Sequence, residues 1–194
     1  MIPDSVPTAF VALNHYLGSD SPAYEGWPEY KKKLKNRRMI PVDMAEALTA
    51  TAYPYEAEGE NTVLSRLLYE GSLAVAKEAM VPSAPLSDIL GFTPAEMADI
   101  KKNESVMWKR LVADNKLYST DAELISNLFD LRPTSSVISP DAPGRAVRYI
   151  GYRIVRAYLA ENPDATLAFI LSPAFYDNGR TVLQKANYSP ETAH

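Results

Sequence analysis

The sequence predicts a mainly α-helical protein of the α+β class, with a small strand region near its N-terminus. Three segments carry this prediction. Residues 93–115 open with a capping-box pattern in which Thr93 is the N-cap, a proline follows and Glu96 stands at the third helical position. Residues 56–80 and 144–163 repeat apolar side chains at helical spacing. With 194 residues and 46% hydrophobic content, the chain can bury one core, so we expect a single domain over 1–194.

The strand region is predicted over residues 8–18, which are short, apolar and followed by a Ser-Asp turn signal. A short helix is the alternative. Residues 19–30 contain two prolines and a glycine and are predicted to be an irregular loop. This loop carries Tyr24, Trp27 and Tyr30, which either pack over the core or form a contact surface, since Tyr and Trp dominate interface hot spots.

A basic run follows this loop, with six cations in residues 31–38, including Lys31, Lys32 and Lys33. Such a run is typical of a solvated face, and the alternative is a surface that contacts an anionic partner. The net charge of −4 gives no global attraction for nucleic acid or anionic lipid. We therefore expect no nucleic-acid partner.

Two helices are predicted in the next part of the chain. The first spans residues 42–53, is capped by Asp43, carries Glu46 in its first turn and ends before Pro54. The second lies within residues 56–80, after a loop. Its expected buried positions are Val63, Leu67, Leu68, Ala74, Val75 and Ala79.

The second half of the chain is predicted to be helical around one long loop. Residues 93–115 read as one helix, and residues 119–131 as another with Ser119 or Thr120 as its cap. The 13 residues of 132–144 contain three prolines and no period, and a loop of this length is often functional.

The helix predicted over 144–163 has an apolar stripe that includes Gly151. A glycine in such a stripe permits the close approach of another backbone. The stripe consists of Val147, Ile150, Gly151, Ile154 and Tyr158, and a neighbouring face carries Arg145, Arg148, Tyr152 and Arg156. Short helices are predicted over 164–172 and 178–188.

Several classes of site are excluded by composition. The chain has no cysteine, which removes disulfides and thiolate chemistry, and its histidines are His15 and the last residue, His194. His15 is expected at the surface. No basic leader with an apolar core opens the chain, and no run approaches the length of a membrane span.

Several segments, in this order, resemble the gliding-motility lipoprotein GldB family, which is related to predicted zinc-dependent proteases of zincin-like fold. They are HYLGSDSPAYEGWPEY, LSRLLYEGSLAVAKEAMVP, GFTPAEMADIKKNESVMW, NKLYSTD, PGRAVRYIGYRIVRAYLAENP and VLQKANYSP. The resemblance implies a zincin-like helical domain that corresponds to the C-terminal two-thirds of the family fold. It also implies a cell-envelope location, as a periplasmic protein or an outer-membrane lipoprotein, a lipid anchor in the full-length protein, and a protein or peptide partner.

The proteolytic relatives bind zinc through H-E-x-x-H and a further carboxylate. The corresponding stretch here is Ala45-Glu46-Ala47-Leu48-Thr49, in which both imidazole positions are lost, and Glu70 stands where the resemblance implies the third ligand. A single carboxylate cannot hold a catalytic zinc ion. We therefore predict no metal, no cofactor and no catalytic residue.

Glu70 has two possible environments. It can lie partly exposed and pair with Arg66 four residues earlier, or it can face inward and meet an arginine of the 144–161 helix, with Arg145 the best candidate. In the second case a residual cleft is expected, with the 132–144 loop at its rim. Its predicted binding residues are Glu46, Glu70, Arg145, Tyr149 and Tyr152.

The function expected from these observations is that of a non-catalytic, envelope-associated binding or assembly protein. One alternative is a peptidase-like hydrolase of zincin ancestry with an unrecognised mechanism. A second alternative is a structural surface module that acts through the basic 31–38 segment.

Overall fold

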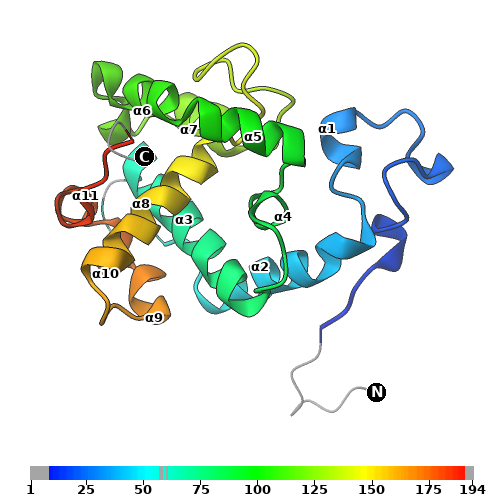
Figure 1. Cartoon of the computed structure of the whole chain (residues 1–194), viewed down its shortest axis with the longest axis horizontal. Coiled ribbons are helices and arrows are strands. Elements are labelled where there is room, and N and C mark those ends of the chain that lie inside the picture. The colour runs from blue at the N-terminus through cyan, green and yellow to red at the C-terminus, as the bar shows by residue number, and fades with distance from the viewer. Residues whose placement is uncertain (1–8, 57–58, 60, 191–194) are drawn as a thin grey trace.

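Figure 1 shows the computed structural model of the chain, which describes residues 9–56, 59 and 61–190. The α-helices of the described residues are α1 (Glu29–Lys32), α2 (Ile40–Ala52), α3 (Val63–Met80), α4 (Leu86–Leu90), α5 (Pro94–Lys102), α6 (Glu104–Val112), α7 (Ala122–Phe129), α8 (Val147–Glu161), α9 (Leu167–Ile170), α10 (Pro173–Tyr176) and α11 (Gly179–Ala186). The 3-10 helices are η1 (Leu13–His15), η2 (Pro22–Tyr24), η3 (Arg37–Met39) and η4 (Ala113–Tyr118). The prediction of a mainly helical protein is confirmed.

The centre of the fold is the pair of helices α3 and α8, which lie side by side in the middle of Figure 1. Helix α3 is buried on nearly every side from Val63 to Lys77, as expected of a helix that other elements surround. Helix α2 packs on α3, while α6 and α11 pack on α8. The buried hydrophobic residues form one cluster that extends from Met39 to Ala186.

Two glycines set the distance between α3 and α8. A Cβ atom on Gly71 would lie 2.3 Å from the carbonyl carbon and oxygen of Gly151, and a Cβ on Gly151 would lie 2.2 Å from the carbonyl oxygen of Leu67. Real Cβ atoms do not approach backbone so closely. The expected close approach at Gly151 is confirmed, and its partner is the glycine that follows Glu70.

The sequence correctly predicted the start of α5 and most of the buried positions of α3 and α8. Thr93 and Glu96 form the predicted capping box at the start of α5. The predicted stripe of α8 is buried throughout. Of the positions expected to be buried on α3, Ala79 is exposed because the last turn of this helix reaches the surface.

The predicted strand region is wrong. The described residues from 9 to 18 form no strand and contain the 3-10 helix η1, which agrees with the short-helix alternative; residue 8 lies outside the described residues. An isolated strand leaves its backbone groups without partners. The described residues offer it no sheet, and their β-type pairing is the isolated bridge between Thr134 and Pro143.

Two predicted caps are also wrong. Helix α2 starts at Ile40, so Asp43 lies in its first turn, where its carboxylate accepts a hydrogen bond from the Tyr16 hydroxyl. Helix α7 is capped by Asp121, which accepts a hydrogen bond of 2.7 Å from the Leu124 amide, in place of Ser119 or Thr120. Polar residues adjacent in sequence compete for the cap, and the path of the chain decides between them.

The helix predicted over 93–115 is interrupted at Asn103. Its φ of −101° and ψ of 12° are not helical, so Asn103 is the C-cap of α5 and the N-cap of α6. Helix α10 was not predicted, because residues 173–176 fall between the two short helices expected near the C-terminus. The 132–144 segment is a loop, as predicted.

Candidate functional site

Ionised side chains meet where α2, α3 and the start of α8 converge. We call this group the charge cluster; it consists of Glu46, Arg66, Glu70, Lys77, Arg145 and Arg148. Glu70, Lys77 and Arg148 are each at most 3% exposed. Charged side chains are rarely buried so completely unless they are paired.

Glu70 occupies the centre of the cluster. Its Oε1 accepts a hydrogen bond of 3.0 Å from Arg66 Nη2, and its Oε2 lies 2.9 Å from Arg148 Nε and 3.8 Å from Arg145 Nη2. Glu70 therefore faces inward, as the second alternative predicted, and the partial exposure of the first alternative is wrong, although the contact with Arg66 forms as well. Its nearest partner on α8 is Arg148, not Arg145.

The glycine contact explains this ion pair. Gly71 follows Glu70 directly, and Gly151 lies three residues after Arg148, so the two charged residues stand beside the point where α3 and α8 touch. Only helices this close allow a short carboxylate and a guanidinium nitrogen to meet at 2.9 Å inside the core.

Glu46 joins α2 to the cluster. Its Oε2 accepts a hydrogen bond from Lys77 Nζ and lies 3.4 Å from Arg148 Nη2. Burial raises the pKa of the Glu46 carboxyl, but the charges of Arg148 and Lys77 outweigh it and hold this pKa well below its ordinary value. Glu46 is therefore a firmly ionised carboxylate.

The pKa of Lys77 is also lowered, which in a lysine disfavours the charged form. Burial and the charge of Arg148 lower its pKa to about 8, although Glu46 acts to raise it. Glu46 is surrounded by cations, which favour its charged form, whereas the enclosed Lys77 has the like charge of Arg148 beside it. Lys77 thus depends on nearby anions to stay charged.

Arg145 is the member of the charge cluster whose side chain makes the fewest hydrogen bonds. Its guanidinium donates no hydrogen bond within the described part of the chain, and its buried Nε has no partner. Its backbone is left-handed, with φ of 66°, a conformation that costs a non-glycine residue free energy. The charge of Arg148 and burial lower the pKa of Arg145 to about 10.

A cavity of about 90 Å³ lies over the cluster. The 132–144 loop contributes to its rim through Arg132 and Gly144, and a Cβ on Gly144 would lie only 2.1 Å from the Arg132 carbonyl oxygen. The lining residues are Lys33, Leu34, Met39, Val42, Asp43, Glu46, Lys77, Asp88, Leu90, Gly91, Phe92, Leu131, Arg132, Gly144, Arg145 and Arg148. The structure therefore places Glu46 and Arg145 on one cavity, with Glu70 beneath them.

The two tyrosines predicted for the same cleft lie elsewhere. The Tyr149 hydroxyl contacts Glu104 at 3.3 Å, on the side of α8 that faces α6, and the Tyr152 hydroxyl donates to Glu78 at 2.9 Å. Burial and the Glu78 carboxylate raise the pKa of Tyr152 to about 12. Tyr149 and Tyr152 thus bind carboxylates outside the charge cluster.

Two members of the charge cluster were not predicted as partners of its carboxylates. Arg148 was assigned to the polar face of its helix, and Lys77 was not considered. A signal was present for Lys77, because it interrupts an apolar run in a helix that is otherwise buried. A lysine in such a position needs an acidic partner.

The aromatic loop and the basic run are divided between core and surface. Tyr24 is buried and its hydroxyl donates to the Asn14 carbonyl at 2.7 Å, whereas Trp27 is 40% exposed. Tyr30 is partly buried beside the ammonium of Lys31.

Within the basic run, Lys33 donates to both oxygens of Glu96, at 2.7 and 2.8 Å, and Lys32 pairs with Glu29. Lys31 and Arg37 are exposed and form no ion pair within the described residues. The cations of this run are therefore not equivalent.

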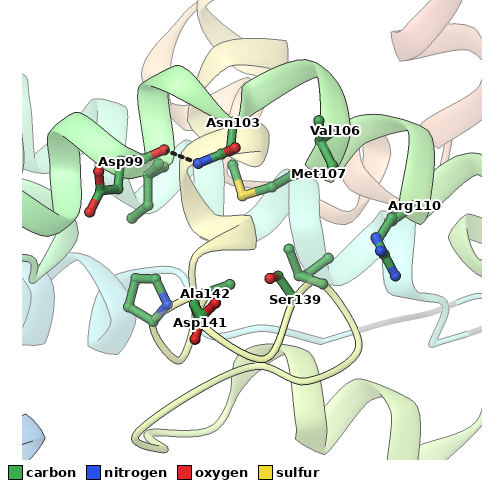
Figure 2. A pocket seen from close by; sticks show the side chains of 11 residues that line it. Asp99, Asn103, Val106, Met107, Arg110, Ser139, Asp141 and Ala142 are labelled. Atoms are coloured by element: carbon green, nitrogen blue, oxygen red, sulfur yellow. Dashed lines mark hydrogen bonds between the residues drawn. The ribbon is translucent and has the colours of Figure 1, made fainter.

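A larger cavity, of about 290 Å³, lies between α5, α6 and the tip of the 132–144 loop (Figure 2). Its polar side chains Asp99, Asn103 and Arg110 are exposed, and Met107 lies buried at its floor. The Asn103 amide donates to the Asp99 carbonyl at 2.8 Å. This cavity contains none of the predicted site residues and no buried charge.

No group of three or more His, Cys, Asp or Glu side chains in residues 9–56, 59 and 61–190 is placed to hold a metal ion. Among the helices of the same residues, none combines the length and the hydropathy of a segment that crosses a bilayer.

Comparison with known families gives one result. The family model described as "Gliding motility protein GldB" matches residues 4–190, which is nearly the whole chain. No curated protein and no solved structure matches.

Proposed function

The chain belongs to the gliding motility protein GldB family, and we propose that it serves in the cell envelope as a non-catalytic binding or assembly component. The family is one of gliding-motility lipoproteins, which supports the envelope location. The proposed places within the envelope are the periplasm and the outer membrane. The proposed partner is a protein or peptide, and the proposed binding residues on the chain are those of the cavity over the charge cluster.

One observation carries the non-catalytic part of the proposal: both carboxylates of the cluster are engaged by cations. Glu70 is held by Arg66 and Arg148, and Glu46 by Lys77 and Arg148. A general base works best when its pKa is near the working pH. The pKa of Glu46 is held well below its ordinary value, so Glu46 is poorly suited to take a proton from water.

The residues do not fit the zinc ion of the proteolytic relatives. Glu46 and Glu70 both contact Arg148, so a divalent cation between these carboxylates would meet a guanidinium already in place. The described histidine, His15, is an exposed residue beside Lys35. Replacement of Arg148 by a metal would leave only oxygen ligands, whereas catalytic zinc sites use nitrogen or sulfur donors as well.

The binding proposal is tested by native electrophoresis of envelope membranes from the source organism, solubilised in mild detergent. We expect the wild-type chain in a complex much larger than its own 21.5 kDa. Arg145→Gln should release the free chain, because it removes the guanidinium of the cavity that has no hydrogen bond. Arg156→Gln is the matched control, since Arg156 lies on α8 with a 55% exposed side chain. A wild-type chain that migrates alone would refute the proposal.

The hydrolase alternative is tested with the purified chain, a mixed peptide substrate, and added zinc or chelator. We expect no cleavage and no stoichiometric zinc. Cleavage that is lost in Glu46→Gln but kept in Glu78→Gln would establish the alternative.

The surface-module alternative predicts that charge reversal in the basic run abolishes complex formation. Lys31→Glu with Arg37→Glu is the appropriate variant, because these cations form no described ion pair, whereas reversal of Lys33 would break its contact with Glu96. We expect this double variant to retain the complex.

A further inference from the structure

We propose that the cavity over the charge cluster binds a doubly charged tetrahedral oxyanion of the phosphate class, with Arg145 as its main ligand. This inference rests on the proposed function, in which the cavity is a binding site, and adds an anionic ligand to the protein or peptide partner proposed there. The ligand can be inorganic phosphate or the phosphate monoester of a lipid headgroup, which share the same recognition chemistry.

The charge balance indicates an anion. Within the charge cluster, four cations face two carboxylates, Glu46 and Glu70. The complete lining of the cavity shows the same excess of two positive charges. Its cations are Lys33, Lys77, Arg132, Arg145 and Arg148, and its anions are Asp43, Glu46 and Asp88. A dianion would cancel this excess, whereas a single carboxylate would leave half of it.

Other contacts of the lining do not remove the excess. Asp88 pairs with Arg38, whose Nε lies 3.0 Å from it, and Lys33 pairs with Glu96; neither of these outer partners lines the cavity. The hydroxyl of Tyr16 donates to Asp43, which keeps that carboxylate hydrogen-bonded without adding charge. The excess of two therefore belongs to Lys77, Arg132, Arg145 and Arg148, which face Asp43 and Glu46, since Arg132 donates to the neutral side chains of Asn127 and Ser126.

Unused hydrogen-bond donors point to the same place. The Arg145 guanidinium makes no hydrogen bond within the described residues. Arg148, 2% exposed, is already engaged by Glu70 at 2.9 Å and by Glu46 at 3.4 Å, so the unused guanidinium donors at the cavity are those of Arg145. Guanidinium groups bind phosphate oxygens through paired N–H donors, and a buried donor without an acceptor is unfavourable.

The cavity has room for a small ion. It leaves about 90 Å³ open, several times the roughly 10–15 Å³ that one water requires. This space accommodates a phosphate group, either as a free ion or at the end of a larger molecule.

The test is isothermal titration calorimetry of the full chain with sodium phosphate, sulfate and acetate at constant ionic strength. We expect one saturable site for phosphate and sulfate and much weaker binding of acetate. Arg145→Gln should weaken phosphate binding by about tenfold or more, the effect of losing one charge-assisted hydrogen-bonding group. Arg156→Gln, in helix α8 that begins two residues after Arg145, should bind as the wild type does.

Several outcomes would overturn the assignment. They are the absence of saturable binding to phosphate, equal affinity for acetate and phosphate, and equal losses in Arg145→Gln and Arg156→Gln. Gln at position 145 must adopt the same left-handed backbone as Arg, so the variant differs from the wild type in its side chain alone. Circular dichroism verifies that each variant is folded. A thermal shift of the wild type by phosphate, absent in Arg145→Gln, provides a second measure of the same site.

The source of the phosphate is separated by flotation with phosphatidylcholine vesicles, with and without phosphatidic acid. Binding that requires phosphatidic acid and is displaced by inorganic phosphate supports a headgroup, and phosphate binding without flotation supports a soluble ion. The outcome of the phosphate-binding experiments is independent of the native electrophoresis of the envelope complex. If phosphate fails to bind while Arg145→Gln still releases the envelope complex, only the ligand class is wrong; phosphate binding without a complex would instead refute the proposed function.

Discussion

Glu70→Gln is the substitution that most directly tests the buried charge cluster. The change keeps the shape of the side chain and removes its charge, so Arg66 loses its carboxylate at 3.0 Å and Arg148 keeps only Glu46, at 3.4 Å. Removing one partner of a buried ion pair costs about 3–5 kcal/mol. In urea, with a slope of about 2–3 kcal/mol per molar, the unfolding midpoint should fall by about 1–2 M.

The assay is equilibrium unfolding followed by the fluorescence of the two tryptophans, the exposed Trp27 and Trp108, which packs edge-on against Tyr188. Glu78→Gln is the control on the same helix, because Glu78 meets Arg156 at 3.6 Å near the surface, where an ion pair contributes about 0–1 kcal/mol. If Glu70→Gln and Glu78→Gln cost the same, the central role of Glu70 is refuted. In a double-mutant cycle, Glu70→Gln with Arg148→Met should cost less than the sum of the single changes.

Three further predictions follow from the same geometry. Gly151→Ala should destabilise the fold by about 1–3 kcal/mol, because its Cβ would lie 2.2 Å from the Leu67 carbonyl oxygen, whereas Gly59→Ala, with ordinary contacts at 3.8 Å, should change the urea midpoint little. The folded-state pKa of Glu46 lies below the ordinary 4.5, so ionised Glu46 stabilises the folded chain above pH 4.5, and this contribution is lost as the pH falls below that value. The difference in unfolding free energy between wild type and Glu46→Gln should therefore narrow in acid. A difference that stays constant with pH would contradict this. Arg145→Gly should raise the unfolding free energy by about 1 kcal/mol, since glycine adopts a φ of 66° without strain, while calorimetry should show that phosphate binding is lost.

Features that depend on a few adjacent residues could be predicted from the sequence. The Thr93 capping box is such a case, because Thr93 and Glu96 satisfy each other's backbone amides without help from the rest of the fold. The cap of α7 could not be chosen, because Ser119, Thr120 and Asp121 are equivalent in isolation, and tertiary packing selects Asp121. The break at Asn103 was missed for a related reason, since asparagine is tolerated within a helix as well as at its end.

The candidate site shows the same limit at longer range. Glycine in the apolar stripe of α8 predicted a close helix contact, but its position opposite Gly71 depends on how α3 and α8 cross. That crossing brings Arg148 to Glu70 and turns Tyr149 toward Glu104. Helical spacing alone cannot tell which of these two side chains faces the charge cluster. The single domain over 1–194 and the zincin-like relationship stay predictions.

Arg145 connects the stability of the cluster with its proposed ligand. Its left-handed backbone, its unused guanidinium and the adjacent charge of Arg148 each raise the free energy of the ligand-free state. An oxyanion in the cavity would accept hydrogen bonds from Arg145 and reduce its repulsion with Arg148, so two of these three costs fall on binding. By mass action, a ligand that binds only the folded chain also stabilises it. The cluster is therefore expected to be more stable with its anion than without it, although the strained backbone at position 145 persists in both states.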